Sequence, residues 1–137
     1  MVGRKYAKMK KILILLFLLA PLLASAQYWY IVDDMNMDRG YGWEGWNKCN
    51  SNNIRIFTDE KSNVKIFTQN TVSTYRALGD YQYQEDNGDI TLSWKCVTES
   101  GEICKLSMIY YSGAVTVILI TEHKHLSFAY NMTPDPM

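Results

Sequence analysis

The sequence has few of the features that mark enzymes, metal sites and helical proteins. It has three cysteines and no close Cys-x-x-Cys pair, which leaves a thiolate metal site without support. Neither a G-x-S-x-G nucleophile elbow nor an H-E-x-x-H zinc motif occurs, and no glycine-rich phosphate loop precedes a helix. No segment carries a long helical period. We therefore expect a non-enzymatic protein with no catalytic residues, no metal site and no cofactor.

Hydrophobic runs long enough to span a membrane are also missing. The apolar run Ile12–Leu23 has twelve residues, whereas a membrane helix needs roughly 20. Five cations lie before it in Met1–Lys11, and Ala-Ser-Ala follows it at residues 24–26. This order predicts a signal-peptide helix over residues 1–26 that is cleaved on export, with a retained anchor as the alternative. The mature chain Gln27–Met137 is then periplasmic or secreted, of bacterial type, with no stable membrane anchor.

Removal of the signal segment changes the charge of the chain. The full sequence has 14 Lys and Arg against 14 Asp and Glu; without the five signal cations, nine cations face 14 acids, a net charge of about −5. An acidic chain disfavours nucleic acid as a partner, because the phosphate backbone attracts basic surfaces. The remaining 111 residues suit one small domain.

Two similar segments in the middle of the chain predict a β-hairpin. Residues 54–58 (Ile-Arg-Ile-Phe-Thr) recur almost unchanged at 64–68 (Val-Lys-Ile-Phe-Thr), with a polar turn at 59–63 between them. Pairing Ile56 with Ile66 gathers the aliphatic side chains on one face. The opposite face then carries two aromatic and two basic side chains: Phe57, Phe67, Arg55 and Lys65.

A second hairpin pairs 90–97 with 103–110 around a three-residue turn. Apolar and polar residues alternate on both sides, and Gly101 can take the left-handed conformation of a G1-bulge turn. The register that follows opposes these residues: Thr98 and Glu102, Cys96 and Cys104, Trp94 and Leu106, Leu92 and Met108, and Ile90 and Tyr110. A slip of one residue would mix the two faces, so the register is strongly specified.

The remaining segments complete an all-β fold. The other expected strands are 28–32, two pieces within 72–83 that an Asn87-Gly88 turn joins to the second hairpin, 115–120 with Val115, Val117 and Leu119 buried, and 126–130. Together they predict a single antiparallel meander of roughly seven strands that closes into a barrel or a two-sheet sandwich. We divide the mature chain into an N-terminal strand and Gly/Trp-rich loop (27–53), the β-domain (54–132) and a tail (133–137) in which prolines end the strands.

Cys96 and Cys104 are the pair that we expect to form a disulfide in an oxidising compartment. Their position has the wider spacing of a hydrogen-bonded pair, with Cα atoms about 5.5 Å apart, which is a less relaxed geometry for a cross-strand bridge. The alternatives are two buried free thiols, or a bond from Cys49 to one of them.

The segment Arg39–Lys48 is the strongest candidate for a binding site. Its glycines let the backbone approach a ligand, and Tyr41, Trp43 and Trp46 offer flat rings for stacking against sugars or a protein partner. Arg39 supplies orienting hydrogen bonds. The alternative is that this loop folds back to plug a barrel end or to cover a sheet edge.

These observations predict an exported, non-enzymatic β-domain that binds a ligand, either a glycan or a small apolar molecule, through the aromatic loop or a barrel mouth. The alternative function is a protein–protein interaction or inhibitor module of the cell envelope. A metal site at His123 and His125, with Glu122 adjacent, is not expected, because it would need a third ligand from elsewhere in the chain.

Overall fold

The computed structural model describes residues 28–49 and 53–135, and these residues are all-β. The strands are β1 (Tyr28–Asp38), β2 (Asn47–Lys48), β3 (Arg55–Thr58), β4 (Val64–Phe67), β5 (Val72–Ala77), β6 (Gln82–Asp86), β7 (Asp89–Thr98), β8 (Ile103–Tyr110), β9 (Val117–Glu122) and β10 (Ser127–Asp135). The described ranges contain no helix, and so none that is long and apolar enough to cross a membrane. The expected signal-peptide helix lies outside the described residues.

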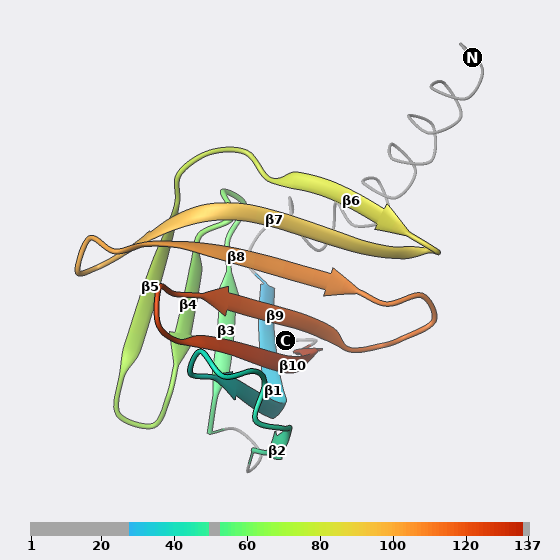
Figure 1. Cartoon of the computed structure of the whole chain (residues 1–137), viewed down its shortest axis with the longest axis horizontal. Helices are drawn as coiled ribbons and strands as arrows, with labels where there is room; N and C mark the ends of the chain where they lie inside the picture. The colour runs from blue at the N-terminus through green and yellow to red at the C-terminus, as the bar shows by residue number, and fades with distance from the viewer. Residues whose placement is uncertain (1–27, 50–52, 136–137) are drawn as a thin grey trace.

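Eight of these strands close into an antiparallel barrel (Figure 1). The hydrogen-bonded order is β1, β3, β4, β5, β7, β8, β9 and β10, and β10 pairs with β1 to complete the circle. Two short strands are additions to this circle: β2 pairs with the second half of β1, and β6 pairs with the first half of β7. The meander is therefore a barrel and not a sandwich, and closure pairs both edges of the sheet.

Both hairpins have the register that the sequence predicts. Ile56 lies opposite Ile66, and every expected pair of the second hairpin from Cys96/Cys104 to Ile90/Tyr110 is present. At the turn of the second hairpin, the Thr98 amide donates to the Glu102 carbonyl over 2.9 Å and Gly101 has φ 87°. Local alternation and turn chemistry are sufficient to fix these pairings.

The first strand is longer than the sequence suggests, because it continues to Asp38 instead of ending in a loop at Asp33. A β-bulge between Val32 and Asp34 shifts its register against β10. The bulge interrupts the period-2 alternation, and for this reason the sequence pattern does not predict the second half of β1 as a strand. The predicted boundary near residue 33 is therefore wrong.

The last two strand boundaries also differ from expectation. β10 includes Pro134, which lies opposite Tyr30 of β1, whereas pairing with β9 ends at Met132. Pro134 is tolerated because it lies beyond the last β9 pair, so its missing N–H removes no bond on that side. Val115 is 79% exposed because β9 begins only at Val117. Val117 and Leu119 are buried as expected.

The core fills the barrel interior. The largest side chains that are almost completely enclosed are Tyr30, Val32, Ile56, Val64, Leu92, Cys96, Leu106, Met108, Leu119, Thr121 and Met132. They come from strands all around the barrel, so each strand is held by the others across the interior as well as by its ladder. Burial also raises the pKa of Tyr30 to about 12, since the tyrosinate would lose its hydration there.

A smaller aromatic cluster lies on the outer face of β1, β3 and β4. The ring of Trp29 is 4.9 Å from that of Phe57 and 5.3 Å from that of Phe67, and the Arg55 guanidinium lies 5.3 Å from the Trp29 ring centre. Arg55 also forms an ion pair with Asp135. The outward placement of the aromatic and basic residues of the first hairpin is thus confirmed, and the cluster joins these strands to the end of β10.

The predicted disulfide is not formed. Cys96 and Cys104 are directly opposed and buried, yet both are free thiols, and so is Cys49. The Thr98–Glu102 bond fixes the ladder phase and makes Cys96/Cys104 a wide, hydrogen-bonded pair, which is unfavourable for a bridge. Burial raises the pKa of Cys96 to about 12, with Cys104 adding to it, and burial and then Glu102 raise that of Cys104 to about 11.

We predict that the two opposed thiols resist alkylation in the folded protein. At neutral pH both stay protonated, and the thiolate is the reactive form. Iodoacetamide followed by intact mass spectrometry should label Cys96 and Cys104 only in urea, where all three cysteines become modified. A pair that remains unlabelled in urea, with a mass two hydrogens lower, would contradict the free-thiol state.

We predict that Leu106→Ala lowers the free energy of unfolding by 2–5 kcal/mol, because it leaves a cavity in the packed interior at a side chain with 0% exposure. Ile103→Ala on the same strand is the control: Ile103 is 64% exposed, and we expect a change within about 0.5 kcal/mol. Urea unfolding followed by circular dichroism measures both. Equal losses in the two variants would show that the barrel interior is not the main core.

Candidate functional site

The aromatic hairpin, residues 39–48, folds back along the second half of β1. Trp43 forms an isolated antiparallel β-bridge with Asp38, and the Glu44 amide donates to the Met37 carbonyl over 2.9 Å. Further along, β2 pairs with β1 at Asp34 and Met35. Pairing between β1 and β3 stops at Ile31, so this half of β1 has a free edge on that side. The backbone of the hairpin covers that edge, as the alternative interpretation of this segment anticipated.

Two side chains of β1 hold the hairpin in shape. The Asp38 carboxylate accepts hydrogen bonds from the amides of Gly40 (2.8 Å) and Gly42 (3.0 Å). The Asn36 side-chain oxygen accepts from the Gly45 amide (2.8 Å), and Asn36 is only 7% exposed. Three backbone amides that would otherwise hydrogen-bond to water are therefore bound by side chains of β1. These bonds hold the hairpin in one conformation before any ligand binds.

The glycines of the hairpin are required by its backbone. Gly40, Gly42 and Gly45 have φ of 104°, 103° and 121°, and a Cβ at any of them would meet no atom within 4 Å. The requirement is thus conformational and not steric. Positive φ at three positions in six residues lets the chain curl tightly around Asp38 and Asn36.

All four predicted site residues lie on this hairpin. Tyr41 is 98% exposed, and Trp43 and Trp46 are 45% and 47% exposed. The Arg39 Nε lies 3.6 Å from the Glu44 carboxylate and 3.3 Å from the Met37 sulfur, so its side chain is held by two other residues of this region. The arrangement offers aromatic faces for stacking together with a cation and an anion for hydrogen bonding.

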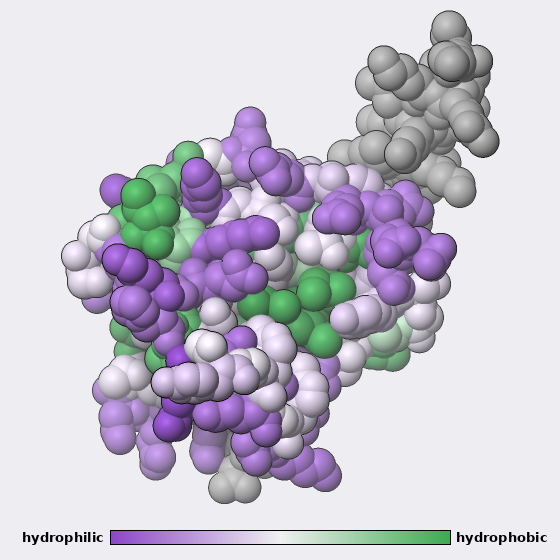
Figure 2. All heavy atoms as spheres, viewed as in Figure 1, coloured by the Kyte–Doolittle hydropathy of each residue, from purple (hydrophilic) through white to green (hydrophobic). Residues whose placement is uncertain are grey.

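An apolar patch on the barrel wall adjoins the hairpin. Ile109 and Ile118 are directly paired on the outer faces of β8 and β9, and Ile120 follows on β9. Ile120 lies opposite Ala129, which in turn lies opposite Asn36, so the register leads from the patch to the base of the hairpin. Figure 2 shows hydrophobic side chains gathered in the middle of this face. The aromatic hairpin therefore borders a partly exposed aliphatic surface.

Sequence reasoning missed a polar chain at one end of the barrel. The Tyr75 hydroxyl lies 3.0 Å from Nε2 of His123, and Nδ1 of His123 lies 3.5 Å from the Glu102 carboxylate. Tyr75 and His123 are 48 positions apart, and Glu102 lies in a different turn from His123, so no sequence pattern links the three residues. His125 is exposed. Among the described residues, no group of three or more His, Cys, Asp or Glu side chains is arranged to hold a metal ion.

We predict that Asp38→Ala loosens the hairpin without unfolding the barrel. It removes the acceptor of two amide hydrogen bonds, each with a net value of about 1 kcal/mol. Amide hydrogen exchange at Gly40 and Gly42 should accelerate by roughly tenfold. Asp38→Asn keeps an oxygen acceptor and is the matched control. Unchanged exchange in Asp38→Ala would mean that the loop keeps its shape by other contacts.

The chain was compared with protein-family models, with curated proteins and with solved structures, and none of the three comparisons finds a match. Its function therefore has to be argued from the chemistry of the aromatic hairpin and its surroundings.

Proposed function

We propose that this chain is an exported, non-enzymatic β-barrel that binds a glycan through its aromatic hairpin. The observation that carries the proposal is the exposure of Tyr41, Trp43 and Trp46 on a hairpin that Asp38 and Asn36 hold rigid. Large exposed aromatic side chains contribute little to stability, and holding them in one shape lowers the entropy that binding would cost.

The surroundings of the rings favour a sugar over a small apolar molecule. An apolar ligand needs an enclosed, mostly hydrophobic pocket, whereas these rings face solvent. A glycan presents apolar ring faces that stack on Trp and Tyr, and hydroxyl groups that hydrogen-bond to neighbours such as Arg39 and Glu44. The barrel mouth is the weaker location, since bulky side chains fill the interior.

We expect purified mature protein to bind a subset of immobilised glycans, and we expect Trp43→Ala and Trp46→Ala each to weaken that binding at least tenfold. This factor corresponds to the roughly 1–2 kcal/mol of a stacked aromatic contact. Tyr111→Ala is the matched control, because Tyr111 is 44% exposed and lies between β8 and β9. The measurement is a glycan array followed by isothermal titration of the best binder. Unchanged affinity in both Trp variants would exclude the hairpin as the site.

A protein partner is the second candidate function, and the aliphatic patch of Ile109, Ile118 and Ile120 favours it. A partner that covered both the patch and the hairpin would contact a continuous surface of aromatic and aliphatic side chains. Ile118→Ser distinguishes the two functions. It should abolish capture of a protein partner from the extracellular fraction of the host and leave glycan affinity unchanged.

A further inference from the structure

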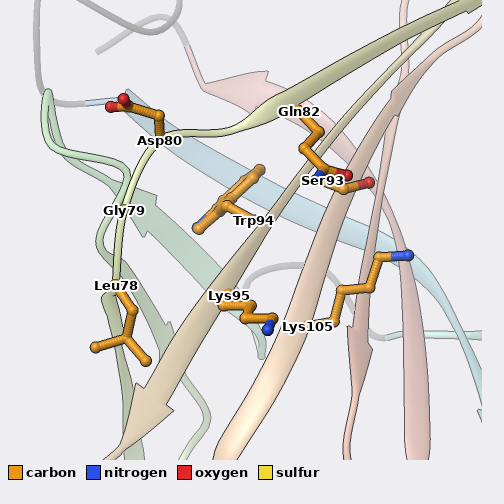
Figure 3. Close-up of a pocket in the computed structure, with 8 residues that line it drawn as sticks. All are labelled: Leu78, Gly79, Asp80, Gln82, Ser93, Trp94, Lys95 and Lys105. Atoms are coloured by element: carbon orange, nitrogen blue, oxygen red, sulfur yellow. The ribbon is translucent and has the colours of Figure 1, made fainter.

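The wall of the barrel is interrupted where β7 changes its neighbour. β5 pairs with β7 as far as Ala77 opposite Cys96, and the Leu78 amide still reaches the Lys95 carbonyl at 2.9 Å. β6 resumes the pairing at Gln82 opposite Ser93. Residues 78–81 therefore arch away from β7 at the level of Trp94, and a pocket of about 380 Å³ lies beside the arch. Its lining is shown in Figure 3: Leu78, Gly79, Asp80, Gln82, Ser93, Trp94, Lys95 and Lys105.

Two lysines on neighbouring strands line this pocket. Lys95 and Lys105 are directly opposed on β7 and β8, and both are exposed on the outer face. Like charges at directly opposed positions destabilise a sheet. Within residues 28–49 and 53–135, neither lysine forms an ion pair, although Glu122 of β9 lies opposite Lys105. The pair is therefore a positive site whose one directly opposed carboxylate, Glu122, lies on the far side of Lys105 from Lys95.

A third cation strengthens the positive character of this region. Arg76 of β5 lies opposite Val97, which places it diagonally next to Lys95 on the outer face. Diagonal neighbours in a sheet are roughly 7–8 Å apart, within reach of long side chains. Because the mature chain carries a net charge of about −5, three adjacent cations make a local exception to an acidic surface.

The rest of the lining defines what could accompany an anionic group. Ser93 and Gln82 add a hydroxyl and a carboxamide next to the lysines (Figure 3). Leu78, 47% exposed, and the edge of Trp94 add apolar surface; the Trp94 Nε1 is already bound to the Ser62 carbonyl at 3.0 Å. Asp80 lies on the arch, across Trp94 from the lysines (Figure 3). The volume falls within the about 300–1,000 Å³ of small-molecule sites.

We propose that this pocket binds a small organic acid whose carboxylate or phosphate group lies between Lys95 and Lys105 and whose carbon skeleton packs against Leu78. The bound carboxylate or phosphate group would offset the repulsion between the two ammonium groups, and its oxygens would accept hydrogen bonds from Ser93 and Gln82. The pocket is formed by the arch of residues 78–81 with β6, β7 and β8, whereas the aromatic hairpin is attached to β1. The site is therefore independent of the proposed glycan binding.

The test is a titration of ¹⁵N-labelled mature protein, observed by amide chemical shifts. The probes are glucuronate and glucose 6-phosphate, with glucose as the neutral match and inorganic phosphate as the bare anion. We expect saturable shifts at Leu78–Gln82 and Ser93–Lys95 with at least one of the two acids and none with glucose. Higher salt should weaken the binding.

Variants test the role of the lysines directly. Lys95→Gln together with Lys105→Gln should weaken binding of the acid at least tenfold. The matched control is Lys65→Gln with Lys124→Gln, which removes the same charge from exposed positions outside both proposed sites. The thermal midpoint of the pocket variant should be equal to or above that of the wild type, because the substitution relieves repulsion. The proposal would be overturned by equal binding of the acid to the two variants or by a response to glucose. It would also be overturned if inorganic phosphate bound and neither acid did, which would indicate an adventitious ion only.

Discussion

The pairing of β1 with β10 is the interaction on which the rest of the structure depends. It joins strands about 100 residues apart, as the hydrogen bond from Thr133 to Asp33 illustrates, and it converts an open meander into a barrel with an enclosed interior. Without it, both strands would present unpaired edges and the core would lose one wall. Thr121 and Met132 could not be enclosed in an open sheet of this size.

Both proposed sites lie where this closed ladder is locally interrupted. β1 continues beyond its pairing with β3, and the aromatic hairpin covers the edge that remains. β7 exchanges β5 for β6, and the pocket beside Lys95 lies at the exchange. A regular barrel wall has every backbone group committed to its neighbours, so positions of changed pairing are where side chains can be presented for other purposes. The rigid barrel then holds these positions in place.

Local patterns predict the hairpins but not the closure. The register of Cys96 and Cys104 follows from alternation and one glycine turn, because both act over a few residues. The contact of β1 with β10 has no local signal, and the bulge after Val32 hides the second half of β1. The disulfide prediction failed because opposed cysteines need the correct ladder phase as well as proximity. The predicted hairpin register already implied that Lys95 faces Lys105, but the arch that forms a pocket beside them depends on β5 and β6 together.

Closure by the terminal strands sets the order in which this protein can become complete. Because Trp29 pairs with Asp135, the barrel cannot be finished until the final strand has been synthesised, however early the central hairpins form. Until then the strands can form only an open, curved sheet whose apolar face is exposed to solvent on one side. Antiparallel pairing also leaves residues 28 and 135 at the same end of the barrel. A short linker between them, with new termini in an exposed turn such as 111–115, would give a circular permutant. In that permutant β10 and β1 would be consecutive strands, and the pairing that closes the barrel would become a local hairpin.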